Sequence, residues 1–287
     1  MMKQLARLAA PLAALFTLSG CLQNEVTVNV KSDGTGTVVE ETLLSAQMSA
    51  MLGGLGGLAP EGQAPQKDPL EEMFGEDAAK KKAAKMGEGV TFQKVEKLDQ
   101  EGKKGARITY AFKDINKLQL RLDAGTDAMQ GAGAGMPGAD AAAAEVEAAK
   151  AKSEPIRFQK AGDKLTVMMP KPDVKPGEDK PAEIPDAAAE MAKDPQAEAM
   201  AKAMFADMKV AVRLVVEPGI AETDATHVDG NKVTLMEMNF GELMQNAEGM
   251  KVLEQMENKK PEELADMLKG IKGVKVETKE KVTIEIK

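Results

Sequence analysis

Alternating apolar and polar residues recur along the chain and predict short β-strands. The first run covers residues 25–31, a turn follows at 32–34, and residues 35–44 are again rich in β-branched side chains. Alternation with a period of two places the apolar side chains on one face of a strand, and a short turn between two such runs is typical of a β-hairpin. Further runs predict a hairpin of 90–98 with 105–112, a hairpin of 156–159 with 164–169, and strands at 210–216, 232–238, 274–277 and 282–286. Asp229-Gly230, a preferred pair for a tight type I′ turn, predicts another hairpin that leads into 232–238.

Helical periodicity appears between these predicted hairpins. A helix is expected over about 69–86, with Pro69 as its first residue, and another over about 194–208, with Asp194 as its N-cap. Two more are expected at 241–256 and from Pro261 to a glycine cap at Gly270. The helix ending at 208 places apolar side chains along one face, namely Ala197, Met200, Ala201, Met204, Phe205 and Met208.

These elements predict an α+β fold, in which an antiparallel sheet of consecutive hairpins carries helices on one side. Two stretches interrupt the pattern: an Ala/Gly-rich linker at 123–153, and a Pro-rich spacer at 170–186. The linker has too few large apolar side chains to offset the entropy of ordering its backbone, so it is predicted to be a disordered insertion. The spacer, with five prolines and several charges, is predicted to be extended and solvated, and the Gly-rich segment 48–68 is predicted to be a flexible insertion. The two parts of the domain, 21–122 and 154–287, are expected to share one core.

The first twenty residues predict a secretory signal peptide. Lys3 and Arg7 precede an apolar run from Leu8 to Leu18, and small residues follow at Ser19 and Gly20. The run is shorter than the roughly 20 apolar residues that a membrane-spanning helix needs. We therefore expect residues 1–20 to be absent from the mature protein.

Cys21, the one cysteine of the chain, follows this segment directly. The sequence Leu18-Ser19-Gly20-Cys21 resembles the lipobox of bacterial lipoproteins, which implies cleavage between Gly20 and Cys21 and lipidation of the Cys21 thiol. Two or three acyl chains, each contributing about 0.8 kcal/mol per buried methylene, anchor a protein stably. The alternative is a free cysteine beside an ordinary cleavage site.

Charge supports a lipid anchor over electrostatic attachment. Removing residues 1–20 takes away Lys3 and Arg7, so the formal net charge falls from −8 to −10. An acidic body is repelled from an anionic bilayer. We expect the membrane to be reached through the N-terminal lipid alone. Because Leu22 is not the Asp that retains lipoproteins in the inner membrane, the periplasmic face of the outer membrane is favoured where a second membrane exists.

Composition excludes several classes of function. One cysteine and one histidine cannot build a disulfide framework, a CxxC pair or a typical zinc site. With 3% aromatic residues and an acidic balance, the chain lacks the stacking surfaces and positive field of a nucleic-acid binder. No cofactor-binding motif is present, and we expect no enzyme activity and no bound cofactor.

Two segments, residues 110–116 and 226–234, resemble a group of uncharacterised bacterial envelope lipoproteins. The order of lipobox, immediate β-hairpin and alternating closing strand is also similar to the LppM-like lipoprotein domain. The resemblance implies a membrane-tethered α+β domain and brings no catalytic residues with it.

The expected function is that of a non-catalytic binding or assembly module, with a lipid or an envelope protein as its partner. A pocket for a lipid or another apolar ligand is predicted between the sheet and the helix face that carries Met200, Met204, Phe205 and Met208. Two alternatives stay open. One is a hydrolase that uses clustered carboxylates, and the other is Cu(I) binding by methionines, for which Met168 and Met169 are also candidates. His227, next to a predicted turn, is expected to be a solvated loop residue.

Overall fold

The computed structural model describes residues 22–46, 48–49, 69–100, 102–121, 154–170, 208–246, 248–249, 267 and 270–287. Within these ranges the chain is mainly β-structure, in two sheets with a few short helices. The predicted signal peptide, the linker at 123–153, residues 171–186 of the Pro-rich spacer and residues 194–207 of the helix predicted at 194–208 lie outside the described residues. Of the flexible insertion predicted at 48–68, Met48 and Ser49 are described; both are helical and Met48 is buried, so the prediction is wrong at these two residues. No helix in the described part is long and apolar enough to cross a membrane.

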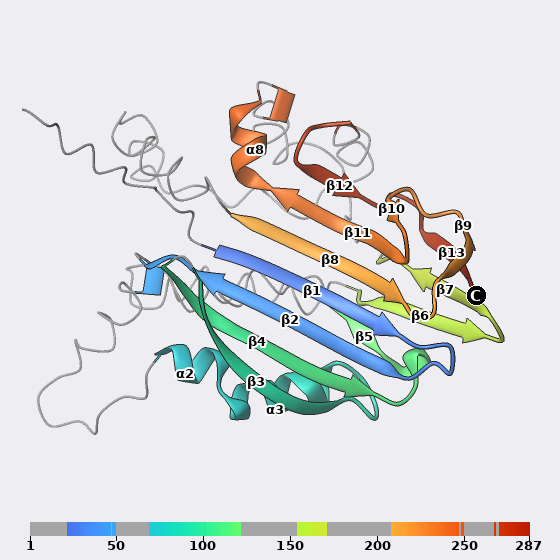
Figure 1. Ribbon diagram of the computed structural model, residues 1–287, viewed down its shortest axis with the longest axis horizontal. Helices are drawn as coiled ribbons and strands as arrows, with labels where there is room; N and C mark the ends of the chain where they lie inside the picture. The colour runs from blue at the N-terminus through green and yellow to red at the C-terminus, as the bar shows by residue number, and fades with distance from the viewer. Residues whose placement is uncertain are drawn as a thin grey trace, which may run out of the picture.

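The large sheet has eight strands. Seven follow the order β10-β11-β8-β1-β2-β4-β3, and β12 also pairs with β11. Figure 1 shows these strands running side by side across the molecule. Their bounds are β1 Leu22–Val30, β2 Gly36–Leu44, β3 Thr91–Gln100, β4 Lys103–Phe112, β8 Lys209–Val216, β10 Val228–Asp229, β11 Lys232–Asn239 and β12 Val274–Val276.

The predicted hairpins β1–β2, β3–β4 and β10–β11 are confirmed, but the prediction of a wholly antiparallel sheet is wrong at its centre. β1 pairs with β8 in parallel, with Val26 opposite Val212 and Val28 opposite Leu214. No short turn connects these two strands, so turn geometry does not dictate their direction. The parallel register brings their apolar side chains to the same face.

The small sheet has five strands in the order β5-β6-β7-β13-β9. The predicted hairpin at 156–169 is confirmed as β6–β7, and the last strand, β13, lies between β7 and β9. The C-terminal strand therefore joins two segments that precede it by a long stretch of chain. The bounds are β5 Gln119–Leu120, β6 Ile156–Ala161, β7 Lys164–Met168, β9 Ile220–Thr223 and β13 Lys281–Ile286.

One apolar cluster spans the inner face of the large sheet and the small sheet. Val28, Val38 and Leu214 of the large sheet belong to it together with Leu165 and Ile284 of the small sheet, and all five are fully buried. Each such side chain contributes roughly 1.5–3 kcal/mol by leaving water. The two parts of the domain, 21–122 and 154–287, meet in this cluster.

Two helices lie on the same side of the large sheet as the small sheet. The single helix predicted at 69–86 is divided into α2, Pro69–Phe74, and α3, Glu76–Lys85. The break is at Gly75, whose backbone is extended (φ −71°, ψ 167°) and whose amide still donates to Glu71. Ala79 and Ala83 of α3 are buried in the core cluster, and α3 lies against β3 (Figure 1).

A further helix, α8, begins directly at the end of β11. It covers Phe240–Gln245, so the helix predicted at 241–256 is interrupted at Asn246; residues 248 and 249 are helical again, whereas 247 and 250–256 lie outside the described residues. The Asn239 side chain accepts a hydrogen bond from the Glu242 amide at the N-terminus, and Asn246 returns to an extended backbone. Short polar side chains that bond to nearby backbone groups favour such helix ends over helix interiors. A single 3-10 turn, η1, covers Ile115–Lys117.

Candidate functional site

The predicted lipidation site lies one residue before the described chain. Gly20 and Cys21 are outside the described residues, whereas Leu22 is the first residue of β1 and is 3% exposed. β1 has β2 on one side and β8 on the other. The residue after Cys21 therefore enters a central strand of the large sheet without an intervening linker.

The predicted apolar ligand site is only partly described. Met200, Met204 and Phe205 lie outside the described residues, so the pocket predicted beside them stays a prediction. Met208 is buried in a second apolar cluster, which we call the N-terminal cluster because it surrounds the start of β1. Its buried members are Leu22, Leu44, Met48 and Met208, with Leu70, Met73, Phe74 and Phe240 packed against them.

Polar side chains separate the N-terminal cluster from the main core. Asn24 of β1 lies opposite Thr42 of β2, and Glu40 of β2 lies opposite Val26. The side chains of Asn24, Thr42 and Glu40 point to the inner face of the sheet, because these residues alternate with outward-facing residues along their strands. The Asn24 amide nitrogen donates to the Thr42 hydroxyl at 2.8 Å. With Tyr110 of the neighbouring strand β4, these residues form what we call the polar band.

An ion pair connects the polar band to helix α3. The Lys82 ammonium lies 2.6 Å from Oε1 of Glu40, whose side chain is 7% exposed, whereas that of Lys82 is 31% exposed. A carboxylate so deeply buried needs a paired charge, because leaving it alone in a low-dielectric interior costs several kcal/mol. The ion pair therefore neutralises the Glu40 carboxylate and links helix α3 to strand β2.

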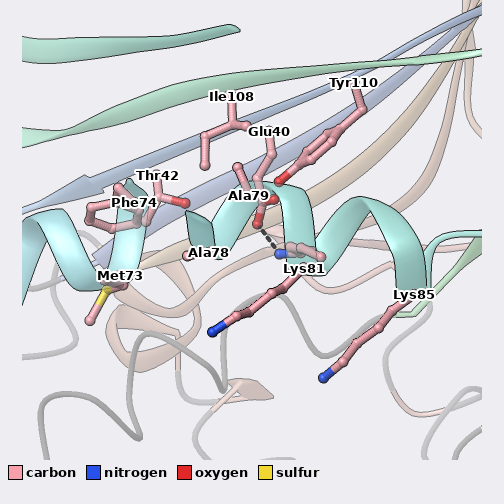
Figure 2. A pocket seen from close by; sticks show the side chains of 11 residues that line it. Glu40, Thr42, Met73, Phe74, Ala78, Ala79, Lys81, Lys85, Ile108 and Tyr110 are labelled. Atoms are coloured by element: carbon pink, nitrogen blue, oxygen red, sulfur yellow. Dashed lines mark hydrogen bonds and ion pairs between the residues drawn. The ribbon is translucent and has the colours of Figure 1, made fainter. Parts of the chain in front are cut away.

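A cavity of ≈ 240 Å³ lies between α3 and the inner face at this point. Its polar floor is formed by Glu40, Thr42 and Tyr110, and its apolar walls include Met73, Phe74 and Ile108. Figure 2 shows the Tyr110 hydroxyl and the Glu40 carboxylate pointing toward each other beside the helix. The Lys82 ammonium supplies the ion pair to that carboxylate. The cavity is thus amphipathic, with its polar groups at the sheet.

Three buried oxygens of the polar band have no hydrogen-bond partner among the described residues. They are Oε2 of Glu40, the hydroxyl of Tyr110 and Oδ1 of Asn24. Leaving a buried polar atom unsatisfied costs about 1–3 kcal/mol, so such atoms are rare in native proteins. Two of the three, those of Glu40 and Tyr110, belong to residues that line the cavity.

The environment of Tyr110 also changes its acidity. Burial raises the pKa of the Tyr110 hydroxyl far above its ordinary value, and the negative charge of Glu40 raises it further. Both effects oppose the tyrosinate, because one removes water and the other adds a like charge. Tyr110 is therefore a neutral hydroxyl at any pH at which the fold persists.

The outer face of the large sheet carries a different kind of polar network. Arg213 of β8 reaches Glu25 of β1 on one side and Glu237 of β11 on the other, the latter at 2.6 Å, while Lys275 lies 3.6 Å from Glu237. Burial alone would raise the pKa of Glu237, but the hydrogen bond from Arg213 and the nearby lysines hold it below its ordinary value.

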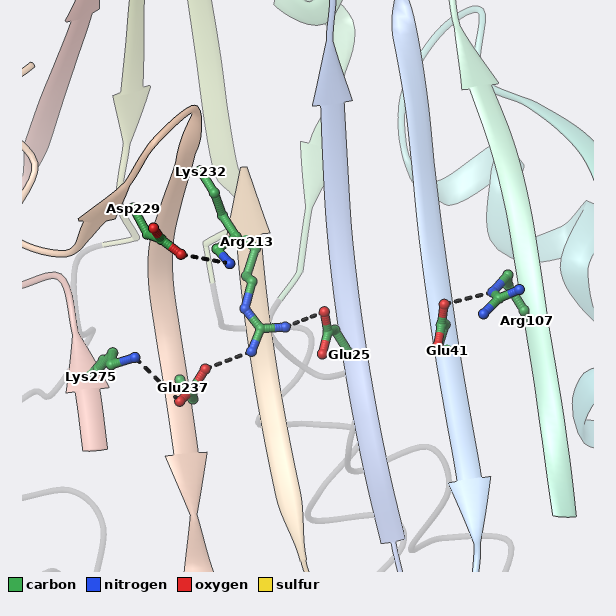
Figure 3. A network of polar contacts seen from close by, with 8 residues as sticks. All are labelled: Glu25, Glu41, Arg107, Arg213, Asp229, Lys232, Glu237 and Lys275. Carbon is green, nitrogen blue, oxygen red and sulfur yellow. Dashed lines mark hydrogen bonds and ion pairs between the residues drawn. The ribbon is translucent and has the colours of Figure 1, made fainter. Parts of the chain in front are cut away.

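Every charge in this network faces a partner on a neighbouring strand (Figure 3). A separate pair, Arg107 with Glu41 at 2.6 Å, joins β4 to β2 in the same manner. Opposite charges across adjacent strands stabilise sheet pairing. We therefore interpret the outer-face network as structural.

The alternative chemistries find no assembled set in the described residues. The described lining of the cavity contains one carboxylate, Glu40, and no group of three potential metal-ligating His, Cys, Asp or Glu side chains occurs in the described part of the chain. His227 is half-buried in the bend before β10. The buried position of Met208 among leucines agrees with core packing. The hydrolase and copper hypotheses stay predictions.

The predicted site residues did not include Glu40 or Tyr110. The sequence did contain a signal for Glu40, since it occupies an inward position of the predicted hairpin, in register with Val38 and Leu44. A carboxylate at such a position needs a partner, and that requirement points to a functional or structural ion pair. Lys82 was not predictable as that partner, because the contact joins residues 42 positions apart.

Comparison with known proteins does not identify a family. No family model matches the chain, and no curated protein sequence matches it. A similar solved structure is the folded domain of the Mycobacterium tuberculosis LppM protein, at 11% identity and a TM-score of 0.30. The alignment covers 79% of this chain and 88% of that one. Membership of the LppM-like family stays a prediction from the sequence.

Proposed function

We propose that this chain is a bacterial envelope lipoprotein, whose folded domain is a non-catalytic binding or assembly module held at a membrane by lipid on Cys21. The observation that carries the proposal is the position of Leu22. It is buried as the first residue of β1, directly after the single cysteine and its lipobox-like sequence. A lipid on Cys21 would hold the domain against the bilayer, because no flexible stalk separates the two.

This arrangement also orients the domain. β1 and β8 run in parallel away from the anchored end, so the N-terminal cluster lies nearest to the lipid and the small sheet lies farther along the strands (Figure 1). The net charge of −10 in the mature chain opposes adhesion to an anionic bilayer. The outer face of the large sheet and the cavity under α3 would then stay accessible to partners in the periplasm. The absence of an Asp at position 22 favours the outer membrane.

Replacing the cysteine tests the anchor. In Cys21→Ser we expect the protein to leave the membrane fraction and to lose incorporation of a labelled fatty acid. The matched control is the double variant Ser19→Cys, Cys21→Ser, which retains one thiol but moves it two residues upstream. We expect it to be unlabelled as well, because lipidation requires the thiol at the cleavage site. If Cys21→Ser stays in the membrane fraction after a high-salt wash, the lipid anchor is wrong.

A further inference from the structure

The polar floor of the cavity under α3 carries buried oxygen atoms whose missing hydrogen bonds lower the stability of the fold. Glu40 and Tyr110 are 5% and 0% exposed, and each has an oxygen without a hydrogen-bond partner in the described part of the chain. Replacement of both groups by apolar side chains of similar shape would remove that cost. Their presence beside a cavity indicates that a bound molecule completes their hydrogen bonds.

The charges in the cavity restrict what that molecule can be. Three lysines line the cavity: Lys82 neutralises Glu40 at 2.6 Å, whereas Lys81 and Lys85 point away from the polar floor (Figure 2). An additional cation at the floor would therefore have no free counter-charge, and an anion there would meet the Glu40 carboxylate. The free oxygen of Glu40 requires a donor, whereas the Tyr110 hydroxyl and the Thr42 hydroxyl can each donate or accept. An uncharged hydroxyl group, which donates and accepts at once, satisfies this set.

The apolar walls and the volume of the cavity also restrict the size and the carbon skeleton of the ligand. Met73, Phe74 and Ile108 supply apolar contacts for the carbon skeleton, and Met is adaptable in the shape it presents. A volume of ≈ 240 Å³ is below the roughly 300–1,000 Å³ of sites that enclose drug-sized ligands. A small polyol or a single sugar ring, free or as the head group of a larger amphiphile, has the appropriate size and chemistry.

We propose that the cavity between α3 and the large sheet binds an uncharged, hydroxyl-bearing ligand, with a ligand hydroxyl hydrogen-bonded to Glu40 and Tyr110. This proposal deepens the binding role proposed above, and it does not depend on the anchor. Helix α3 covers the site, and the ion pair between Lys82 and Glu40 positions both this helix and the carboxylate that accepts the hydrogen bond.

The chain is well suited to a direct test, because Tyr110 is its one tyrosine and it has no tryptophan. Its intrinsic fluorescence therefore reports on the cavity alone. Full-length protein carrying Cys21→Ser is titrated with glycerol, methyl glucoside and monooctanoylglycerol, and binding is followed by Tyr110 fluorescence and by the methyl resonance of Met73. We expect at least one probe to shift both signals. A response to monooctanoylglycerol alone would identify the head group of an amphiphile as the source.

Variants then locate the contacts. We expect Tyr110→Phe and Glu40→Gln each to weaken binding of the responding probe about tenfold or more, because each variant leaves the buried ligand hydroxyl without one of its hydrogen bonds. Binding to these variants is measured by calorimetry and by the Met73 resonance. Thr109→Val is the matched control: it removes a hydroxyl from the adjacent residue of β4, on the outer face, and should leave binding unchanged.

Two results would overturn the proposal. One is the absence of any shift with all three probes at millimolar concentrations. The other is equal binding of the O-methylated form of the responding probe, which would assign the site to apolar contacts alone. Neither result bears on the anchor, because membrane release of Cys21→Ser is measured separately.

Discussion

Tyr110→Phe is predicted to stabilise the protein in the absence of ligand. The substitution removes one oxygen and keeps the ring, which is fully buried in the main core cluster. None of the described residues is a hydrogen-bond partner of that oxygen, so its removal should recover about 1–3 kcal/mol of unfolding free energy. If the hydroxyl were instead satisfied by an ordered water, its loss would cost about 0.5–1.5 kcal/mol. The two possibilities differ in sign.

Urea unfolding followed by far-UV circular dichroism measures this difference, since the signal does not depend on the tyrosine. An unchanged m-value would show that the two proteins expose the same surface on unfolding. Thr109→Val, on the opposite face of β4, is the control and should change stability by less than about 0.5 kcal/mol. A lower unfolding free energy for Tyr110→Phe would refute the reasoning and would place a bound water at the hydroxyl.

The ionisation of Tyr110 provides an independent check on the same environment. Burial, and then the charge of Glu40, raise the pKa of the hydroxyl in the folded protein. The unfolded chain loses this proton near pH 10 while the folded protein keeps it, so the free energy of unfolding should fall as the pH rises above about 10. Tyrosinate absorbance should therefore appear together with loss of the far-UV signal. Tyrosinate formed near pH 10 in a protein that is still folded would contradict the buried position.

Three further substitutions test the framework around the site. Arg213→Met should lower the unfolding free energy, measured in urea, by about 1.5–3 kcal/mol, because it leaves Glu237 without the hydrogen bond from Arg213. Because the pKa of Glu237 is depressed in the folded protein, this loss of stability should be present at neutral pH and should shrink as the pH falls through that pKa. Glu277→Ala should accelerate amide exchange at Thr226, whose backbone and hydroxyl both donate to the buried carboxylate, with little effect expected if the loop is held otherwise. Gly36→Ala should destabilise by more than about 1 kcal/mol, because its new methyl group would lie 2.0 Å from a backbone oxygen; an unchanged melting temperature would contradict the close approach.

The sequence pattern predicted the hairpins well because residues close together along the chain determine both their strands and their turns. Alternation along β1 and β2, together with the turn between them, defines a register in which Val28 meets Val38. The Asp-Gly pair of the β10–β11 turn is likewise confirmed, with Gly230 at a φ of +63°. Helix ends were less predictable. The alanine- and lysine-rich run around α3 has high helix propensity, but Gly75 allows the chain to break the helix.

The sequence by itself determined the strands, their inward faces and the position of the one thiol, since each depends on residues that are neighbours along the chain. Only the tertiary structure decided that β8 lies parallel to β1, that β13 joins the small sheet, and that Lys82 covers Glu40. These contacts connect segments far apart in sequence, and their energies depend on shared burial that no local pattern encodes. The polar band was visible as an inward-facing glutamate, but its cavity exists only because α3 packs across the strands.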